Sequence, residues 1–395
     1  GYYGAFYAWV SADTGEEVCP SYFFKDVLTG RDIHNHFNSW QIHVSPDIAY
    51  TVWRYYTVTA DFDFLRDYGA EILFEVAQFL VSRAHFKKDK KRYEFIRLLG
   101  PDEYHENVDN NFFTAYQARH AVDVAVQAYE LLQAEAPEAL GAIEKRVRVH
   151  VDAWREMADL IYVKEPGEAP DAPNDQVIEQ FDGFFALEDI DPKSLAERLI
   201  DPGEYWGWPN GIAVETQVSK QADVTQTFVL HPTAFDREVM AANVAYYEPR
   251  TQHGSSLSPS VYGIVGSWIG HDDIAYDYFI RSCTVDLFNT NKAVSGGTFI
   301  GGIHTAACGV AWQIVTAGFL GMVVEGAELS FTPRLPAGWQ SVSFSMEVRG
   351  ARIHVVVRRD AVHCTSAGES AATLRIRANG AAEDLAPGST VSLTA

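Results

Sequence analysis

The stretch FTAYQARHAVDVAVQAYELLQA, residues 113–134, decides the fold class of this chain. Its apolar residues return every three or four positions, which places them on one face of an amphipathic helix. Residues 138–162 repeat the pattern after a short break, so we expect an antiparallel helix pair. The apolar stripe of the first helix consists of Ala121, Val124, Ala125, Ala128, Leu131 and Leu132.

The helical period continues toward the N-terminus. Residues 45–57 begin with Ser-Pro, a typical helix start, and residues 64–83 carry an apolar stripe at helical spacing. Residues 163–185 and 201–212 are rich in Pro, Gly and Asp, which predicts long loops between helices.

Strand period replaces helix period near residue 331, where apolar and polar residues begin to alternate. We therefore expect a mainly α chain, in which helical hairpins are followed by a small C-terminal β-sandwich. The helical part is compatible with an (α/α) barrel, although an α-solenoid shows the same period. The expected strands cover 342–348, 353–357, 374–376 and 391–393, the last two around the turn at Asn379 and Gly380.

Composition excludes several classes of partner. The formal net charge is −22, so a nucleic-acid backbone or an anionic membrane surface would be repelled. No segment approaches the roughly 20 apolar residues of a membrane-spanning helix. Four cysteines without CxxC spacing favour reduced thiols and a cytoplasmic location. The N-terminus has no initiator Met and no signal-peptide pattern, so we expect a chain cut from within a longer one.

The densest polar cluster is GPDEYHENVDNN at 100–111, which lies between two predicted helices at a Gly-Pro breaker. Its adjacent carboxylates, Asp102 and Glu103, would repel each other if both were ionised in a partly dry site. The pKa of one of them should therefore rise toward the value that a general acid needs. Alternatively, these acids only cap the helix that begins near residue 110.

Four motifs follow one another along the chain: GPDEYHENVDNN at 100–111, KQADV at 220–224, RTQHGSSLS at 250–258 and GIHTA at 302–306. Together they resemble the motifs of glycoside hydrolase family 65, which contains maltose, kojibiose, nigerose and trehalose phosphorylases and acid trehalases. The resemblance implies an (α/α)6 barrel over residues 1–325, incomplete at its N-terminus, and a C-terminal β-sandwich over 326–395.

The resemblance also implies roles for individual residues. Glu103 would be the general acid that protonates the departing glycosidic oxygen. Lys220 and Gln221 would bind the glucosyl ring in subsite −1, and we expect Asp102 to bind substrate beside them.

The segment GAFYAWVSADTGEE at 4–17 is similar to a family stretch near the same subsite. Trp9 matches the family's tryptophan, although Ala8 stands where relatives usually have proline. Asp13, Glu16 and Glu17 follow in the same loop. They either accept hydrogen bonds from sugar hydroxyls or are ordinary solvated acids.

The resemblance places the phosphate site in the segment around His253, Gly254, Ser255 and Ser256, and His304 is expected to add a donor. The chemistry is suitable, because two hydroxyls, backbone N–H groups and a histidine can surround an anion. On its own, a Gly-Ser-Ser segment is more often a serine-capped helix start.

These assignments imply an inverting phosphorylase of α-glucosides, with inorganic phosphate as co-substrate and neither cofactor nor metal. Phosphate is already anionic, so no carboxylate base is needed, whereas a hydrolase needs a second carboxyl group. The alternatives are a hydrolase of the same family, with Glu248 as the nearest candidate base, and a non-catalytic sugar-binding protein. Family members commonly dimerise, so a homodimer is expected.

Three features depart from the family pattern. An upstream Phe-Trp-Asp-Thr-Glu stretch is missing from this sequence. Ala115 and Gln117 occupy a segment that usually contains asparagine, and Tyr262 replaces a frequent histidine. We therefore expect unusual acceptor specificity and doubtful activity for this exact chain.

Overall fold

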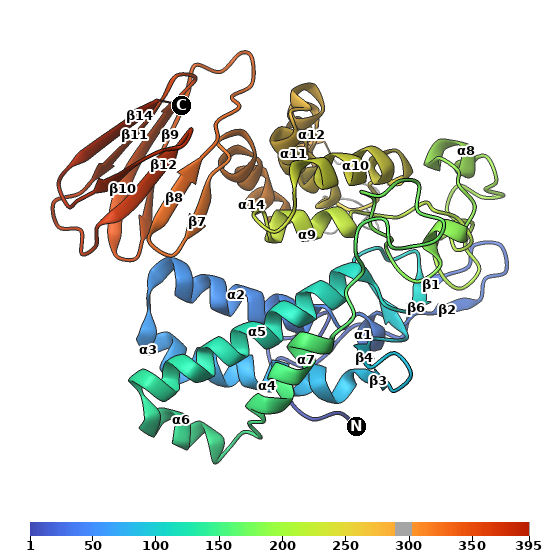
Figure 1. The fold of residues 1–395 in the computed structure, drawn as a ribbon. Helices are drawn as coiled ribbons and strands as arrows, with labels where there is room; N and C mark the ends of the chain where they lie inside the picture. Colours follow the sequence, from blue (N-terminus) through green and yellow to red (C-terminus); the bar gives the residue numbers. More distant parts are fainter. Residues whose placement is uncertain (289–301, 395) are drawn as a thin grey trace. The chain divides into compact units, whose positions relative to one another are not determined.

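Helices dominate the chain as far as residue 319, and strands make up most of the chain beyond it (Figure 1). The computed structural model describes residues 1–288 and 302–394. It confirms the prediction of a mainly helical chain with a small C-terminal β-domain. Within those residues, no helix is both long and apolar enough to cross a lipid bilayer.

The α-helices of the described residues are α1 (Phe37–Trp40), α2 (Val44–Thr59), α3 (Phe62–Phe64), α4 (Ala70–Arg83), α5 (Phe112–Glu135), α6 (Pro137–Glu144), α7 (Val151–Leu160), α8 (Pro192–Ala196), α9 (Val224–Leu230), α10 (Arg237–Tyr247), α11 (Ser258–Ile269), α12 (Asp272–Thr284) and α14 (Thr305–Gln313). Short π-helical segments cover Leu65–Gly69 and Ile314–Phe319, and 3-10 turns cover Phe184–Ala186 and Glu248–Arg250.

The predicted helices over 45–57 and 113–134 are confirmed as α2 and α5. The prediction of one helix over 138–162 is wrong, because the chain turns at 145–150 between α6 and α7. Val147, which is 4% exposed, turns inward at this break, and no proline or glycine in the turn announces it. The predicted loops over 163–185 and 201–212 are confirmed apart from the short turn at Phe184–Ala186.

Residue contacts divide the chain into two units. The first comprises 1–53, 63–227 and 245–252, and the second comprises 54–62, 228–244 and 253–395.

The core of the first unit lies where α5 packs against α4 and α7. The rings of Phe74 on α4 and Trp154 on α7 are 5.3 Å apart, and both side chains are fully buried. Small alanines along α5, including Ala121 and Ala125, are also fully buried. Their size permits close approach of the neighbouring helices, so much apolar surface is removed from water.

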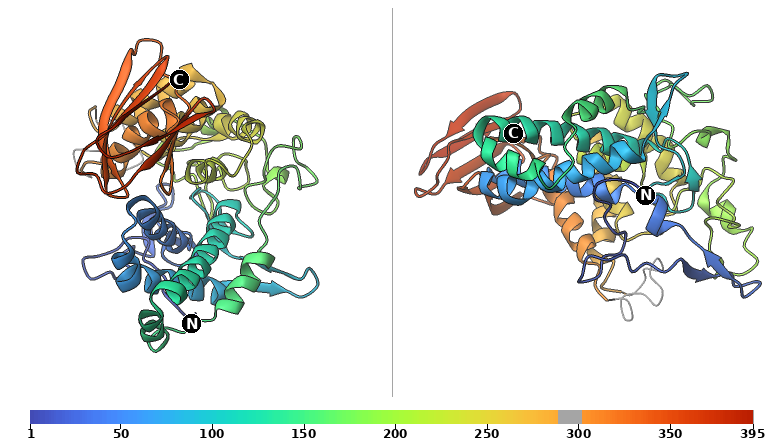
Figure 2. Two further views of the ribbon diagram at one scale, coloured as in Figure 1. Left: turned by 60° about the vertical axis from the view of Figure 1, so that its left-hand side comes forward. Right: turned by 90° about the horizontal axis from the view of Figure 1, so that it is seen from below.

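The second unit contains two four-stranded sheets in the orders β14-β11-β10-β9 and β13-β12-β8-β7. Figure 2 shows these strands, coloured orange to red, from two further sides. Neighbours pair antiparallel, except that β8 and β12 run parallel. The strands are β7 (Val323–Glu325), β8 (Glu328–Phe331), β9 (Ser341–Val348), β10 (Ala351–Arg358), β11 (Ala361–Ser366), β12 (Leu374–Ala378), β13 (Ala381–Leu385) and β14 (Thr390–Thr394).

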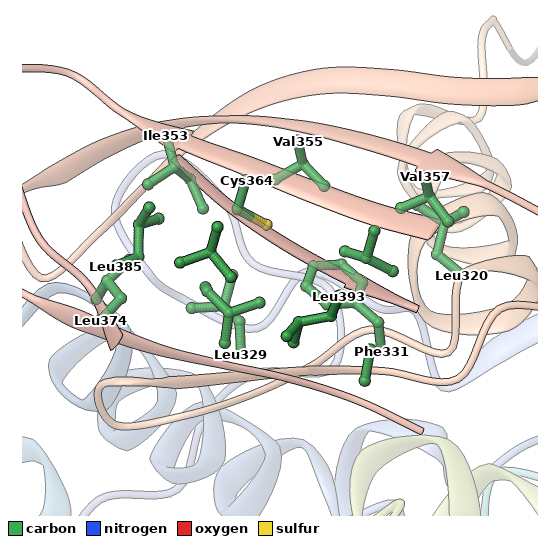
Figure 3. Packing of buried hydrophobic residues seen from close by; sticks show 14 of the residues in the cluster. Leu320, Leu329, Phe331, Ile353, Val355, Val357, Cys364, Leu374, Leu385 and Leu393 are labelled. Atoms are coloured by element: carbon green, nitrogen blue, oxygen red, sulfur yellow. The ribbon is translucent and has the colours of Figure 1, made fainter. Parts of the chain in front are cut away.

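One apolar core joins these two sheets. In Figure 3, side chains of β10 and β11 such as Val355 and Cys364 point toward those of β8 and β12 such as Leu329 and Leu374. All four side chains are at most 1% exposed. The alternation of buried and exposed residues along β10 is expected of a strand with one buried face.

The predicted pairing around the Asn-Gly turn is wrong in part. Asn379 and Gly380 have positive φ and join β12 to β13, whereas β14 pairs with β11. Strand β13 reads Ala-Ala-Glu-Asp-Leu and has too few apolar residues to show a strand period. The first strand of its sheet begins at Val323, three residues before the expected domain start at 326.

Candidate functional site

A short hairpin carries the predicted general acid. Strands β5 (Leu98–Leu99) and β6 (Glu106–Val108) pair antiparallel, and residues 100–105 form the loop between them. A Cβ atom at Gly100 would lie 2.5 Å from side-chain atoms of Asn111 and Asp223. Glycine at this position therefore lets the loop lie directly against those two side chains.

The Glu103 carboxylate contacts the ammonium group of Lys220, and the two side chains are only 12% and 18% exposed. The Tyr205 hydroxyl donates a hydrogen bond of 2.9 Å to the Glu103 carbonyl. The structure thus brings together two predicted site residues that lie 117 positions apart in the sequence. They form a half-buried acid–ammonium pair.

Gln221 belongs to the same cluster, because its side-chain amide donates to the carbonyl of Pro101. It is half-buried. Lys220 and Gln221 therefore both face the loop that holds Glu103, as a shared subsite requires.

Asp102, which we predicted to bind substrate, has a fully buried side chain. Its oxygens accept the backbone N–H groups of Lys220 and Tyr104 at 2.8 and 3.2 Å. A side chain with internal partners and no exposed surface cannot reach a sugar in this arrangement, so the expected direct contact is corrected to a positioning role.

The sequence predicted that the pKa of either Asp102 or Glu103 would rise. For Asp102 the structure indicates the opposite, a lowered pKa. Burial is the largest effect on Asp102 and opposes ionisation, but the charge and hydrogen bond of His105 hold its pKa below the ordinary value. Burial raises the pKa of Asp223 to about 7, and the charge of Asp102 adds to that rise. Burial likewise raises the pKa of Glu106 to about 7.

Trp9 lies in a small apolar cluster next to the hairpin. The cluster contains Cys19, Phe37 and Leu99, and the rings of Trp9 and Phe37 are 5.1 Å apart. Leu99 is the last residue of β5, so Trp9 packs close to the start of the acid loop. Glu17 accepts the backbone N–H of Trp9 at 2.6 Å.

The other acids of that loop differ from Glu17. Glu17 also accepts the backbone N–H of Cys19 at 2.8 Å, so it organises the loop. Asp13 and Glu16 are exposed.

The predicted phosphate segment lies in the second unit, immediately before α11. The His253 ring is not available as a cationic donor in this arrangement. Its Nδ1 lies 3.0 Å from the Ser258 hydroxyl, and its Nε2 lies 2.9 Å from the Tyr278 hydroxyl. Burial lowers the pKa of His253 to about 3, and Arg281 adds to the decrease.

His253 therefore shapes this loop as a neutral ring, and we correct its expected contact with phosphate. Its own backbone has φ of 57°, an uncommon conformation for a residue with a side chain. The candidate donors that remain are Gly254, Ser255 and Ser256, all half-buried. The Ser255 hydroxyl accepts the Leu257 N–H at 3.3 Å, which leaves its own proton for another acceptor.

His304 stands at the N-terminal end of α14 and is held by Asp286. One carboxylate oxygen lies 2.6 Å from Nδ1 and the other accepts the His304 N–H at 2.8 Å. This two-point contact fixes the ring, with Nε2 as the nitrogen not used by Asp286.

The sequence predicted no role for His105, Asn111 or Asp223, although all three lie inside the family motifs at 100–111 and 220–224. Asn111 donates to the Asp223 carboxylate at 3.0 Å and caps α5 by accepting the Thr114 N–H at 2.9 Å. The contact between Asn111 and Asp223 joins residues 112 positions apart, so no local signal could reveal it.

Comparisons with known proteins agree with the motifs. The family model of the glycosyl hydrolase family 65 central catalytic domain matches residues 1–313, and that of the family's C-terminal domain matches residues 322–384.

Individual relatives match nearly all of the chain. It is 51% identical over 373 residues to 1,2-alpha-glucosylglycerol phosphorylase of Bacillus selenitireducens, covering 93% of this chain and 48% of the relative. It is 36% identical to nigerose phosphorylase of Lachnoclostridium phytofermentans, covering 92% and 48%.

Among solved structures, a candidate kojibiose phosphorylase from the human microbiome matches with a TM-score of 0.76 at 26% identity, covering 91% of this chain and 47% of that one. The chain thus spans about half the length of the relatives it matches.

Proposed function

The chain belongs to glycosyl hydrolase family 65, and we propose that it carries the catalytic part of an inverting α-glucoside phosphorylase. The main support for this proposal is the half-buried contact between the Glu103 carboxylate and the Lys220 ammonium group. Glu103 lies in the loop 100–105, whose sequence resembles the family's motif. The names of the similar relatives support phosphorolysis over hydrolysis.

Glu103 is the proposed general acid. Its carboxyl group protonates the glycosidic oxygen as the bond to the anomeric carbon breaks. Lys220 and Gln221 bind hydroxyls of the glucosyl ring and keep the bond within reach of the acid. Trp9 contributes apolar surface at the same subsite.

Phosphate is the proposed nucleophile. It attacks the anomeric carbon from the face opposite the leaving group, so an α-linked glucosyl unit leaves as β-glucose 1-phosphate. Its donors are the hydroxyls of Ser255 and Ser256, the backbone around Gly254 and the ring of His304. The 12-residue helix α11 starts directly after this segment, and a helix N-terminus favours an anion. Neither a cofactor nor a metal is required.

For the fold, we propose an (α/α)6 barrel for the helical part of the chain, followed by a β-sandwich domain that begins with β7 at Val323 rather than at residue 326. The likeness to a solved structure with a TM-score of 0.76 and the helical hairpin α5–α7 support this arrangement. We also propose a homodimer, and a cytoplasmic location that is in keeping with four free cysteines.

For the acceptor, we propose a small polyol, with glycerol as the first candidate. The relative with 51% identity is a glucosylglycerol phosphorylase, whereas the nigerose and kojibiose phosphorylases are 36–37% identical.

The test is to incubate the intact protein with 2-O-α-glucosylglycerol, kojibiose, nigerose, maltose and trehalose, each with and without phosphate. We expect phosphate-dependent release of β-glucose 1-phosphate, fastest from glucosylglycerol. Equal rates without phosphate, with free β-glucose as product, would replace phosphorolysis by hydrolysis. A carboxylate such as Glu248 would then have to serve as the base.

A further inference from the structure

A buried carboxylate–imidazole contact lies inside the loop that carries Glu103. The Nδ1 atom of His105 is 2.6 Å from Asp102 Oδ2, and its Nε2 atom is 2.8 Å from the Thr216 carbonyl oxygen. The two side chains are 3% and 0% exposed. The rings of Phe181 and Phe184 lie 5.2 and 5.9 Å from the imidazole.

The partners determine where the protons are. A carbonyl oxygen only accepts, so Nε2 of His105 carries a proton. The Asp102 oxygens accept three N–H groups, as an ionised carboxylate does, so Nδ1 carries a proton as well. The three donors are the backbones of Lys220 and Tyr104 and the side chain of Gln180, at 2.8, 3.2 and 3.0 Å.

The electrostatics agree with this assignment. Burial is the largest single effect on His105 and favours its neutral form. The charge and hydrogen bond of Asp102, the Thr216 carbonyl and the charge of Asp223 outweigh it, so the pKa of His105 is raised.

The Asp102 carboxylate acts on both sides of Glu103. By accepting the Tyr104 N–H, it closes a turn around Glu103. By accepting the Lys220 N–H, it fixes the residue whose ammonium contacts the Glu103 carboxylate. The Asp102 N–H donates to the Asp223 carboxylate at 3.2 Å, which ties the loop 100–105 to the buried residue just before α9.

We propose that Asp102 and His105 form a buried carboxylate–imidazolium pair that positions the general acid Glu103, through the turn around Glu103 and through Lys220. The proposal rests on the proposed function. Asp102 and His105 are positioning residues, because neither needs to touch substrate. The positive charge of His105 keeps Asp102 ionised, and an ionised carboxylate holds its three N–H donors more strongly than a protonated one would.

The test compares His105→Gln with the unmutated protein on two substrates. A glucoside with a poor leaving group needs protonation by Glu103, whereas α-glucosyl fluoride depends far less on it. We expect kcat for the glucoside to fall on the order of 10- to 100-fold, because small misplacements of a catalytic group are costly. For the fluoride we expect a change below about three-fold.

The control is His120→Gln, at a half-buried histidine in the same unit. Burial lowers the pKa of His120 to about 4, so its replacement removes no charge. We expect both rates of this variant to stay close to the original. Equal losses on both substrates in His105→Gln, or none on either, would overturn the positioning role.

A measurement on the unmutated protein covers the case that His105→Gln does not fold. With 15N-labelled histidine, NMR at pH 8 should show an imidazole ring with protons on both nitrogens, assigned to His105 by elimination with single His→Gln variants. A neutral His105 ring at pH 8 would refute the pair. If the unmutated protein showed no phosphate-dependent cleavage at all, the proposed function would fail, while the NMR result would still decide the protonation of His105.

Discussion

The Asp102 carboxylate accepts the backbone N–H of Lys220 at 2.8 Å, while the ammonium group of the same lysine contacts Glu103. Two adjacent acidic residues thus hold the main chain and the side chain of one lysine. Because Lys220 is 118 positions away from Asp102, this arrangement depends on tertiary folding rather than on local sequence.

Replacing Glu103 by Gln should abolish phosphorolysis of glucosides with poor leaving groups, because the amide cannot protonate the departing oxygen. General acid catalysis contributes about 10²- to 10⁴-fold, so kcat should fall by that order. Activity toward α-glucosyl fluoride should persist, and the melting temperature should stay within a few degrees. Turnover of glucosylglycerol near the original rate would transfer the acid role to another residue.

Replacing Lys220 by Met should weaken glucosyl binding while it preserves side-chain length. A hydrogen bond from a charged donor contributes about 1.5–3 kcal/mol, so kcat/KM for the glucoside should fall roughly 10- to 100-fold. The KM for phosphate should change little. Lys193→Met, at an exposed position, serves as the control. If both variants behave alike, Lys220 does not bind the substrate.

Replacing both Ser255 and Ser256 by Ala should raise the KM for phosphate at least about ten-fold, since two hydroxyl donors to an anion are lost. The KM for the glucoside should stay nearly constant. Ser267→Ala, near the other end of α11, is the matched control. An unchanged KM for phosphate in the double variant would make this loop purely structural.

The pH dependence of stability should reveal Glu106. Its side chain is 3% exposed, and burial raises its pKa from 4.5 to about 7; the His36 N–H opposes the rise and the charge of Glu103 adds to it. Between pH 4.5 and about 7 the folded state keeps a proton that the unfolded chain loses. The free energy of unfolding therefore decreases as pH rises through this range.

Glu106→Gln removes this penalty with little change of shape. At pH 8 the variant should be more stable than the original by roughly 1–3 kcal/mol, and at pH 4 the two should be equal. Urea unfolding at both pH values measures this difference, with the exposed Glu383→Gln as control. Parallel stability curves for the original and Glu106→Gln would contradict the assignment.

Two glycines should respond in opposite directions to replacement by alanine. At Gly100 the new Cβ would lie 2.5 Å from Asp223 and Asn111, which are both buried, so we expect a loss of about 1–3 kcal/mol. At Gly141, inside α6, nothing lies within 4 Å of the new atom, and a gain of about 0.5–1 kcal/mol should follow. Thermal unfolding of both variants tests this contrast, and equal shifts would refute it.

Much of the fold can be predicted from local patterns in the sequence. The Ser-Pro pair places the helix α2 correctly, and the alternation in β9 and β10 announces both strands. The break between α6 and α7 has no such signal, because residues 145–150 contain neither proline nor glycine. Val147 is buried within this break, and burial is a property of the folded chain. Strand β8 pairs with the distant β12, and its four residues are too few to show a period.

For the candidate site, the sequence could predict only the residues that lie in the family motifs. The motifs predicted site roles for Glu103, Lys220 and Gln221, and the fold brings these residues together. They could not show that the Asp102 side chain points inward or that Ser258 and Tyr278 occupy both nitrogens of His253. Burial and hydrogen-bond partners are properties of the folded chain, so residue type alone does not specify them.

The second unit includes residues 54–62, although the rest of that unit begins only at residue 228. Arg349 donates from its backbone to the Val58 carbonyl at 2.7 Å, and its guanidinium donates to the Thr57 carbonyl, 292 positions earlier. A ribosome adding about 5–20 residues per second needs roughly 15–60 s to make the chain between them. During that interval Thr57 and Val58 at the end of α2 have not yet met Arg349, their hydrogen-bond partner. A chaperone bound to this end of α2 during synthesis would have to dissociate before these hydrogen bonds could form.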